Sequence, residues 1–281
     1  MAHDLIPAGV RARLRGLTLR SRRATGGHGL GLHASRSRNA GLEFAQYRAY
    51  ERGDELRQVD WKLYARSDKF FVREAERESP LALWILLDAS ASMAPRLDAA
   101  KALAASLAEL AIAGGDRFGL IVLRQDGLAL VPPGSGARQR DRVLLALRDV
   151  AAAGSFPVES AMAPLWERIA TRDLVVLLSD LFDSACAEAA AKLSAAGREV
   201  LAVQLLTVEE RDFPFDGGHR FRDPETGEEL LVDAPAMRDD YLARFADAQA
   251  TLRAELEGAG VTLVEHALDR PLDAPLRTLF A

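Results

Sequence analysis

The sequence contains a single cysteine, Cys186, which excludes an intrachain disulfide framework and a site built from several cysteines. Its five histidines are scattered, and no His-x-x-x-His pair occurs among them. The longest apolar runs, LALWILL and LVVLL, fall far short of the roughly 20 residues that a membrane-spanning helix needs. The N-terminus also lacks the apolar core of a signal peptide, so we expect a cytoplasmic protein with no membrane span.

Two catalytic motifs are missing as well. The chain has no Gly-x-x-x-x-Gly-Lys-Ser/Thr loop, so nucleotide binding by a P-loop is excluded. It also has no Gly-x-Ser-x-Gly motif, which argues against a serine hydrolase. Apolar residues nevertheless make up 49% of the 281 residues, enough for a substantial core.

The charge is distributed unevenly. Residues 1–40 hold eight arginines and one acid, Asp4, a charge of +7, which leaves −12 for the rest because the whole chain carries −5. This basic, partly flexible arm is either solvated, paired with the acidic body, or a site for an anionic ligand. No aromatic residue precedes Phe44, so a stacking surface is lacking and we expect no nucleic-acid partner.

Aromatic residues are concentrated directly after the arm. Seven of the eighteen lie between Phe44 and Phe71, a density that predicts a small packed, β-rich extension over residues 41–80. This segment also carries a cluster of charged and aromatic residues: Arg52, Asp54, Arg57, Asp60, Trp61 and Arg66. The cluster is either an internal salt-bridge network that fastens the extension to the rest of the protein or a partner-binding surface, and the pattern favours the structural role.

Short apolar runs alternate with helical patterns over residues 81–281. Residues 81–88 read as a strand buried on both faces, and residues 96–115 as an alanine-rich helix that ends at two glycines. The same alternation continues to the C-terminus, interrupted near 217–233 by a segment that predicts a β-hairpin insert. Strands and helices in this order predict a doubly wound α/β domain with a mostly parallel sheet.

Oxygen-bearing side chains follow two of the predicted strands. Asp88, Ser90 and Ser92 alternate at the end of one strand. Ser179 and Asp180 end a later one. Carboxylate and hydroxyl oxygens suit Mg²⁺ or another hard divalent cation, provided that the two strand ends meet at one edge of the sheet.

The same side chains could have different roles. Ser and Asp also satisfy free backbone N–H groups in turns and at helix starts, so the triplet could be a turn and cap cluster, and Asp180 could cap the next helix. Asp88 could also be the nucleophile of a Mg²⁺-dependent phosphohydrolase. That chemistry usually needs a second acid two residues on, where this chain has Ser90.

Four blocks of sequence together carry a resemblance to known proteins. FAQYRAYERGDELRQVDWKLYAR, LWILLDASASM, VVLLSDL and FRDPETGEELLVD occur in this order. They resemble the bacterial "domain of unknown function 58" family over roughly residues 28–281, and YRAYERGDELRQVDWKLYAR is the most specific block. The Asp-x-Ser-x-Ser pattern with a later Asp also resembles the metal-ion-dependent adhesion site of von Willebrand factor A domains.

This resemblance implies a von Willebrand factor A-like fold with a β-rich N-terminal extension. It implies a non-enzymatic protein-interaction module that acts with a MoxR-type AAA+ ATPase in the chaperone-like assembly or maturation of a client protein. Asp88, Ser90, Ser92 and Asp180 would be the metal ligands.

One position departs from the family pattern. Adhesion sites add a threonine from an intervening loop, and Phe156 stands where that threonine is expected. Ser155 is the nearest hydroxyl, so the resemblance implies a degenerate site that includes Ser155.

Overall fold

The computed structural model describes residues 5–19, 44–50, 59–75, 82–171 and 173–280. Contacts divide the chain into two compact units, one of residues 1–27 and 81–281 and one of residues 28–80. Among the described residues, no helix is both long enough and apolar enough to cross a membrane.

The smaller unit contains an antiparallel strand pair and one helix. Strands β1 (Phe44–Ala49) and β2 (Phe71–Ala75) pair with each other, and α2 (Trp61–Ser67) lies between them in sequence. Asp60 caps α2, because its Oδ1 accepts hydrogen bonds from the backbone N–H groups of Lys62 and Leu63. This cap fixes where the helix begins.

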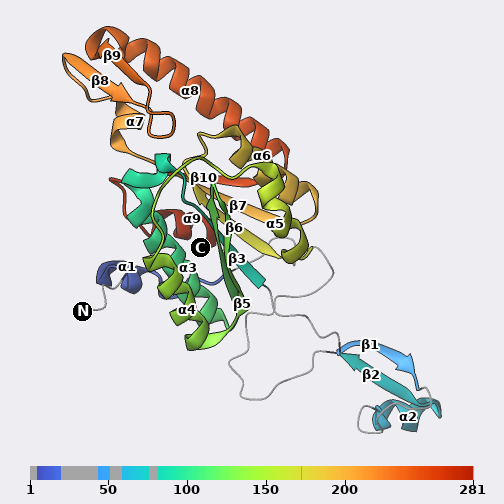
Figure 1. Ribbon diagram of the computed structural model, residues 1–281. Coiled ribbons are helices and arrows are strands. Elements are labelled where there is room, and N and C mark those ends of the chain that lie inside the picture. Colours follow the sequence, from blue (N-terminus) through green and yellow to red (C-terminus); the bar gives the residue numbers. More distant parts are fainter. Residues whose placement is uncertain (1–4, 20–43, 51–58, 76–81, 172, 281) are drawn as a thin grey trace. The chain divides into compact units, whose positions relative to one another are not determined.

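The larger unit is an α/β domain built on one six-stranded sheet (Figure 1). The strands are β3 (Ala82–Asp88), β4 (Arg117–Arg124), β5 (Gly127–Gly134), β6 (Leu174–Ser179), β7 (Glu199–Leu206) and β10 (Thr262–Ala267). The helices are α1 (Ala8–Arg13), α3 (Leu97–Gly114), α4 (Gly136–Arg148), α5 (Ala163–Arg168), α6 (Ser184–Ala195), α7 (Val208–Asp212), α8 (Ala234–Gly258) and α9 (Ala274–Phe280), with short 3₁₀ helices η3 (Ala91–Arg96) and η4 (Glu159–Met162).

The sheet has the order β10-β7-β6-β3-β4-β5, and only the edge strand β5 runs antiparallel to its neighbour. Alternate residues of β3 face opposite layers. Leu83, Ile85 and Leu87 join the core that contains residues of α1, α3, α4 and α9. Trp84 and Leu86 join the core that contains residues of α5, α6 and α8. The prediction of a doubly wound, mostly parallel sheet is therefore confirmed.

The strand order reverses between β3 and β6. The chain leaves β3 toward the α3 layer and leaves β6 toward the α6 layer, although the two strands are hydrogen-bonded neighbours. In doubly wound sheets, ligands bind beyond the carboxyl ends of the strands on either side of such a reversal, and here those strands are β3 and β6.

Part of the basic N-terminal segment belongs to the core of the larger unit. Ile6, Val10, Leu14 and Leu19 are all less than 7% exposed and lie in the same core as α3 and α9. Arg13 extends this attachment, because its Nε donates to Oδ1 of the buried Asp273 at 2.6 Å. Residues 5–19 are thus not a solvated arm. Their high arginine content gave no indication that their apolar residues enter the core.

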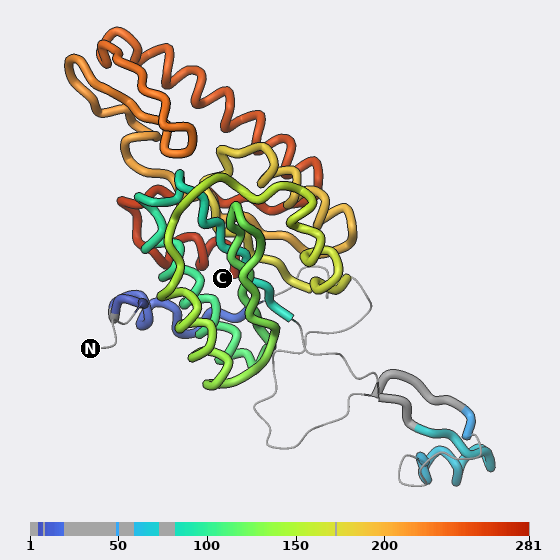
Figure 2. The backbone as a smooth tube through the Cα atoms, viewed as in Figure 1, coloured from blue at the N-terminus to red at the C-terminus, as the bar shows by residue number. Residues whose placement is uncertain are grey.

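A hairpin and a long helix extend from one end of the sheet. After β7 the chain forms α7, then the antiparallel hairpin of β8 (Gly218–Arg222) and β9 (Glu229–Asp233), and returns along α8 (Figure 2). Phe213, at the end of α7, stacks on Tyr241 of α8 at a ring distance of 4.5 Å and on Phe221 of β8 at 5.6 Å, so aromatic packing joins the hairpin to α8.

We expect that Leu19→Ala lowers the free energy of unfolding by about 2–5 kcal/mol, because it removes a buried side chain from the core. The control is Arg15→Ala, an exposed position nearby, where a change within about 0.5 kcal/mol is expected. Urea denaturation of the full chain measures both. Equal, small effects would show that the N-terminal segment does not contribute to the core.

Candidate functional site

Asp88 is the last residue of β3 and lies at the switch point of the sheet. Its carboxylate is buried and accepts two hydrogen bonds, from the backbone N–H of Ser90 at 2.9 Å and from the hydroxyl of Ser179 at 2.7 Å. Burial raises the pKa of Asp88 above its ordinary value, although these hydrogen bonds lower it, and the nearby Asp180 raises it further. Asp88 is thus held at the end of a buried strand, and within the described residues no ion pair joins it to a cation.

The two serines of the motif face each other across the next turn. The hydroxyls of Ser90 and Ser92 are 3.0 Å apart, and Ser90 makes no side-chain cap to η3. The backbone N–H of Ala91 donates to the carbonyl of Gly154 at 2.7 Å. This bond joins the Asp88 turn to the loop in which a threonine ligand is expected from the family pattern.

That loop places Ser155 and Phe156 in different environments. Ser155 is partly buried and directly follows Gly154, whose carbonyl is bound by Ala91. Phe156 is only 4% exposed and packs in the core on the α5 and α6 side. The position expected to carry a threonine ligand is therefore a core position in this protein.

The end of β6 completes the edge. Besides donating to Asp88, the Ser179 hydroxyl accepts the N–H of Leu181 at 3.0 Å and lies 3.4 Å from the thiol of Cys186. Leu181 has a φ of 58°, in the left-handed region that a leucine rarely adopts. Cys186 is fully buried, and burial raises its pKa well above the ordinary value, so it serves as a small core residue.

Asp180 is engaged differently from Asp88. Its Oδ2 accepts a hydrogen bond from Nη1 of Arg96 at 2.8 Å, and both side chains are 2% exposed. Its Oδ1 accepts the N–H of Phe182 at 3.2 Å. Asp183, and not Asp180, caps α6, because the Asp183 carboxylate accepts the N–H of Ala185.

Together these segments form one continuous edge, which we call the carboxyl rim: residues 88–96, 153–156 and 179–184. The rim fits a divalent cation only in part. Asp88, Ser90 and Ser92 offer oxygen donors from one turn, whereas Asp180 is already paired with a guanidinium. No group of three or more His, Cys, Asp or Glu side chains that could hold a metal occurs in the described part of the chain.

The predicted charged cluster of the smaller unit is only partly described. Arg52, Asp54 and Arg57 lie outside the described residues. Trp61 is 55% exposed and packs edge-on against Tyr64. Arg66 is exposed and Asp60 caps α2, so of the described members Asp60 has a structural role and Trp61 presents an aromatic surface.

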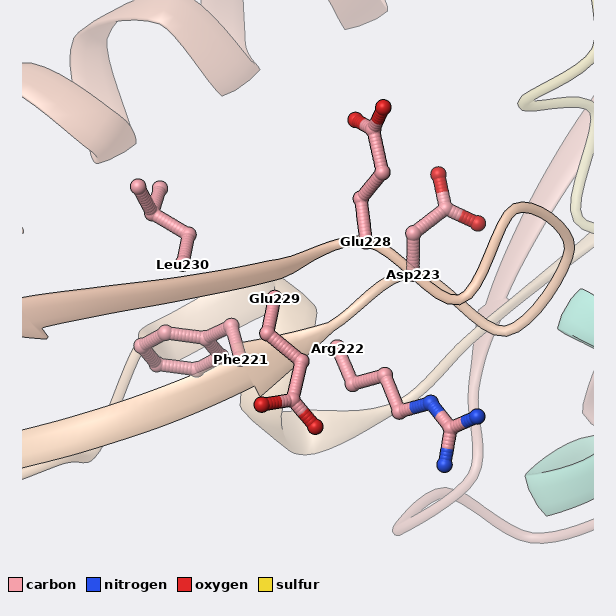
Figure 3. A pocket seen from close by; sticks show the side chains of 6 residues that line it. All are labelled: Phe221, Arg222, Asp223, Glu228, Glu229 and Leu230. Carbon is pink, nitrogen blue, oxygen red and sulfur yellow. The ribbon is translucent and has the colours of Figure 1, made fainter.

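The hairpin also carries a concavity. Its lining residues are Phe221, Arg222, Asp223, Glu228, Glu229 and Leu230. Figure 3 shows that these side chains point to different sides of the hairpin and do not converge. This concavity therefore does not assemble a set of ligand groups.

Two residues of the rim and its surroundings were not identified from the sequence. Arg96 precedes an apolar helical pattern, and nothing in its neighbourhood indicates a buried partner. Glu210 was detectable, because Thr207 and Glu210 form a capping box, a spacing that can be recognised in the sequence. Its contact with Arg96 was not detectable in this way.

Two mycobacterial proteins are similar to this chain over nearly its whole length. Uncharacterized protein Rv1480 of Mycobacterium tuberculosis (strain ATCC 25618 / H37Rv) and Uncharacterized protein Mb1516 of Mycobacterium bovis (strain ATCC BAA-935 / AF2122/97) are each 28% identical to it over 282 residues. Each alignment covers 95% of this chain and 87% of the relative.

Solved structures also show similarity. The conserved hypothetical protein BatB from Bacteroides thetaiotaomicron is 15% identical, with a TM-score of 0.42, and the SpRpn10 VWA domain is 14% identical, with a TM-score of 0.42. Each comparison covers 71% of this chain and 95% of the other. At such low scores we assign the fold from the strand order of the protein itself.

The family model described as "Protein of unknown function DUF58" matches residues 46–251. This range includes α2 of the smaller unit, the carboxyl rim and most of α8. Because the match covers well over half of the chain, the protein belongs to the DUF58 family.

Proposed function

We propose that this protein is a non-enzymatic interaction module that docks a partner protein at the carboxyl rim. We further propose that it acts with a MoxR-type AAA+ ATPase in the chaperone-like assembly or maturation of a client protein. The observation that carries the proposal is the gathering of Asp88, Ser90, Ser92 and Ser179 at the switch point of the sheet, where this fold class binds ligands.

The rim also offers apolar surface for docking. Phe182 is 48% exposed beside the buried Asp180. A groove of about 620 Å³ between α6 and α8 begins at Leu181 and Phe182 and is lined by side chains such as Leu252. Exposed aromatic residues next to polar groups are typical anchors of protein–protein interfaces.

A divalent cation at the rim would be held by Asp88, Ser90 and Ser92, with Ser155 as the nearest hydroxyl of the second loop. When bound, such an ion would supply positive charge for a carboxylate of the partner. The protein's own groups orient the donors, because Ser179 and the N–H of Ser90 hold the Asp88 carboxylate in place.

The phosphohydrolase alternative receives less support from the geometry. Asp88 is only 2% exposed, and both of its carboxylate oxygens accept hydrogen bonds. The residue two positions on is Ser90, whose hydroxyl faces Ser92 and cannot supply the general acid of that reaction.

We expect that Phe182→Ala weakens binding to a MoxR-type ATPase from the same organism by about tenfold or more, because it removes an exposed aromatic anchor. Asp88→Ala is expected to abolish binding. The matched control is Leu145→Ala on α4, which is 60% exposed and is not a residue of the rim. Surface plasmon resonance in the presence of ATP measures all three, and unchanged affinity in both rim variants would refute docking at the rim.

Divalent cation binding is tested separately from partner binding. We expect Mn²⁺, measured by isothermal titration calorimetry, to bind the wild-type protein and to bind Ser90→Ala at least tenfold more weakly, because one of three oxygen donors is lost. Ser184→Ala, an exposed serine at the start of α6, is the control. Identical Mn²⁺ affinities of Ser90→Ala and Ser184→Ala would show that the ion binds elsewhere.

Replacing Asp88 with asparagine should change how stability depends on pH. Since the folded protein raises the pKa of Asp88, ionisation is harder in the folded state, and the wild type loses stability as pH rises from about 4 through the raised pKa. Asn cannot ionise, so Asp88→Asn should gain thermal stability over the wild type as pH rises through this range.

The control for this experiment is Asp126→Asn. The hydrogen bond from Arg124 lowers the pKa of Asp126, so this substitution should give no such gain. Thermal midpoints are measured for both variants from pH 4 to pH 8. A gain for Asp88→Asn that is absent or independent of pH would contradict a raised pKa of Asp88 in the folded protein.

A further inference from the structure

Arg96 is a buried cation at the carboxyl rim. It ends η3, directly after Pro95, and is 2% exposed. Arginine is almost never buried to this degree unless it is paired. Its position, next to the ends of β6 and β7, therefore requires anionic partners from other segments.

Two carboxylates and a backbone carbonyl supply those partners. Nη1 donates to Oδ2 of Asp180 at 2.8 Å and to the carbonyl of Leu205 at 3.3 Å, while Nη2 donates to Oε1 of Glu210. The guanidinium carbon lies 5.4 Å from the centre of the Phe182 ring. Nε finds no hydrogen-bond partner within the described part of the chain.

We propose that Arg96 is the resident cation of the rim and takes, at Asp180, the place that a divalent metal ion would otherwise hold. A guanidinium has a fixed fork of donors, and here the fork bridges two acids, one after β6 and one in α7. Asp180 thereby becomes a positioning residue, and any metal bound at the rim is held without it.

The geometry at Asp180 supports this division. Its second oxygen already accepts the N–H of Phe182 at 3.2 Å, so both oxygens are engaged and freeing either of them for a metal ion would break a contact. The guanidinium would also repel a divalent ion placed at the same carboxylate, because like charges in a buried site interact strongly.

Arg96 also links the rim to the segment that leads into the hairpin. Glu210 is the third residue of α7, and its other oxygen accepts the N–H of Thr207 at 2.8 Å in the capping box. The carbonyl of Glu210 accepts the hydroxyl of Tyr241 on α8 at 2.9 Å. One buried guanidinium thus connects the ends of β6 and β7 with α7 and α8.

This role of Arg96 rests on the proposed function of the rim, but it is tested on the protein alone, without a partner. Thermal midpoints are measured on the full chain in EDTA and in millimolar MnCl₂, for the wild type, Arg96→Met, Asp180→Asn and the double variant. Arg124→Met, at an exposed arginine paired with Asp126, is the control.

In EDTA we expect Arg96→Met to lower the midpoint by about 10 °C, because two buried acids lose their cation. Mn²⁺ should then raise the midpoint of Arg96→Met by several degrees more than that of the wild type, since Asp180 and Glu210 become free to bind it. The double variant should lose this additional response, and Arg124→Met should behave like the wild type.

Two results would overturn the proposal. One is an equal Mn²⁺ response in the wild type and Arg96→Met. The other is a smaller Mn²⁺ response in Asp180→Asn than in the wild type, which would show that Asp180 already binds metal. The second comparison stands even where Arg96→Met does not fold, and neither result bears on whether a partner docks at the rim.

Discussion

The burial of β3 on both faces determines where the polar groups of the candidate site lie. All seven residues of the strand are buried, and its neighbours β4 and β6 satisfy its backbone on both sides. A charged side chain can leave such a strand only at its end, where other groups can bind it. Asp88 occupies that end and is bound by Ser90 and by Ser179 of the neighbouring strand, so the carboxylate itself joins the two strands at the switch point.

The two aspartates of the rim differ in how their charge is balanced. Asp180 has Arg96 as a buried partner, whereas the donors to Asp88 among the described residues are a hydroxyl and an N–H group, and burial raises the pKa of Asp88. A paired carboxylate stabilises the arrangement of the loops, and an unpaired one retains the capacity to bind a cation or a donor group. This difference separates a structural acid from a candidate ligand within a single short edge of the sheet.

Hydrogen bonds and an ion pair also connect the rim to α7 and, through it, to α8 of the larger unit. Arg96 reaches Glu210 of α7, and Tyr241 and Arg238 of α8 bind backbone carbonyls around the same turn. The segment around α7, from which the hairpin and α8 extend, is therefore bonded to the rim. The DUF58 match, which spans residues 46–251, includes this part of the larger unit and α2 of the smaller unit, so the match is not confined to the α/β sheet.

The sequence by itself determined the alternation of strands and helices that begins at residue 81, the doubly wound sheet and the placing of Asp88, Ser90 and Ser92 after a buried strand. These features depend on apolar periodicity and on neighbours a few residues apart. Only the tertiary structure decided that Arg96 pairs with Asp180 and Glu210, which are 84 and 114 residues away. It also decided that Leu14 and Leu19 of an arginine-rich segment enter the core and that Phe156 is a core residue. Contacts between distant segments depend on which connections meet at one edge of the sheet, and local patterns carry no information about that meeting.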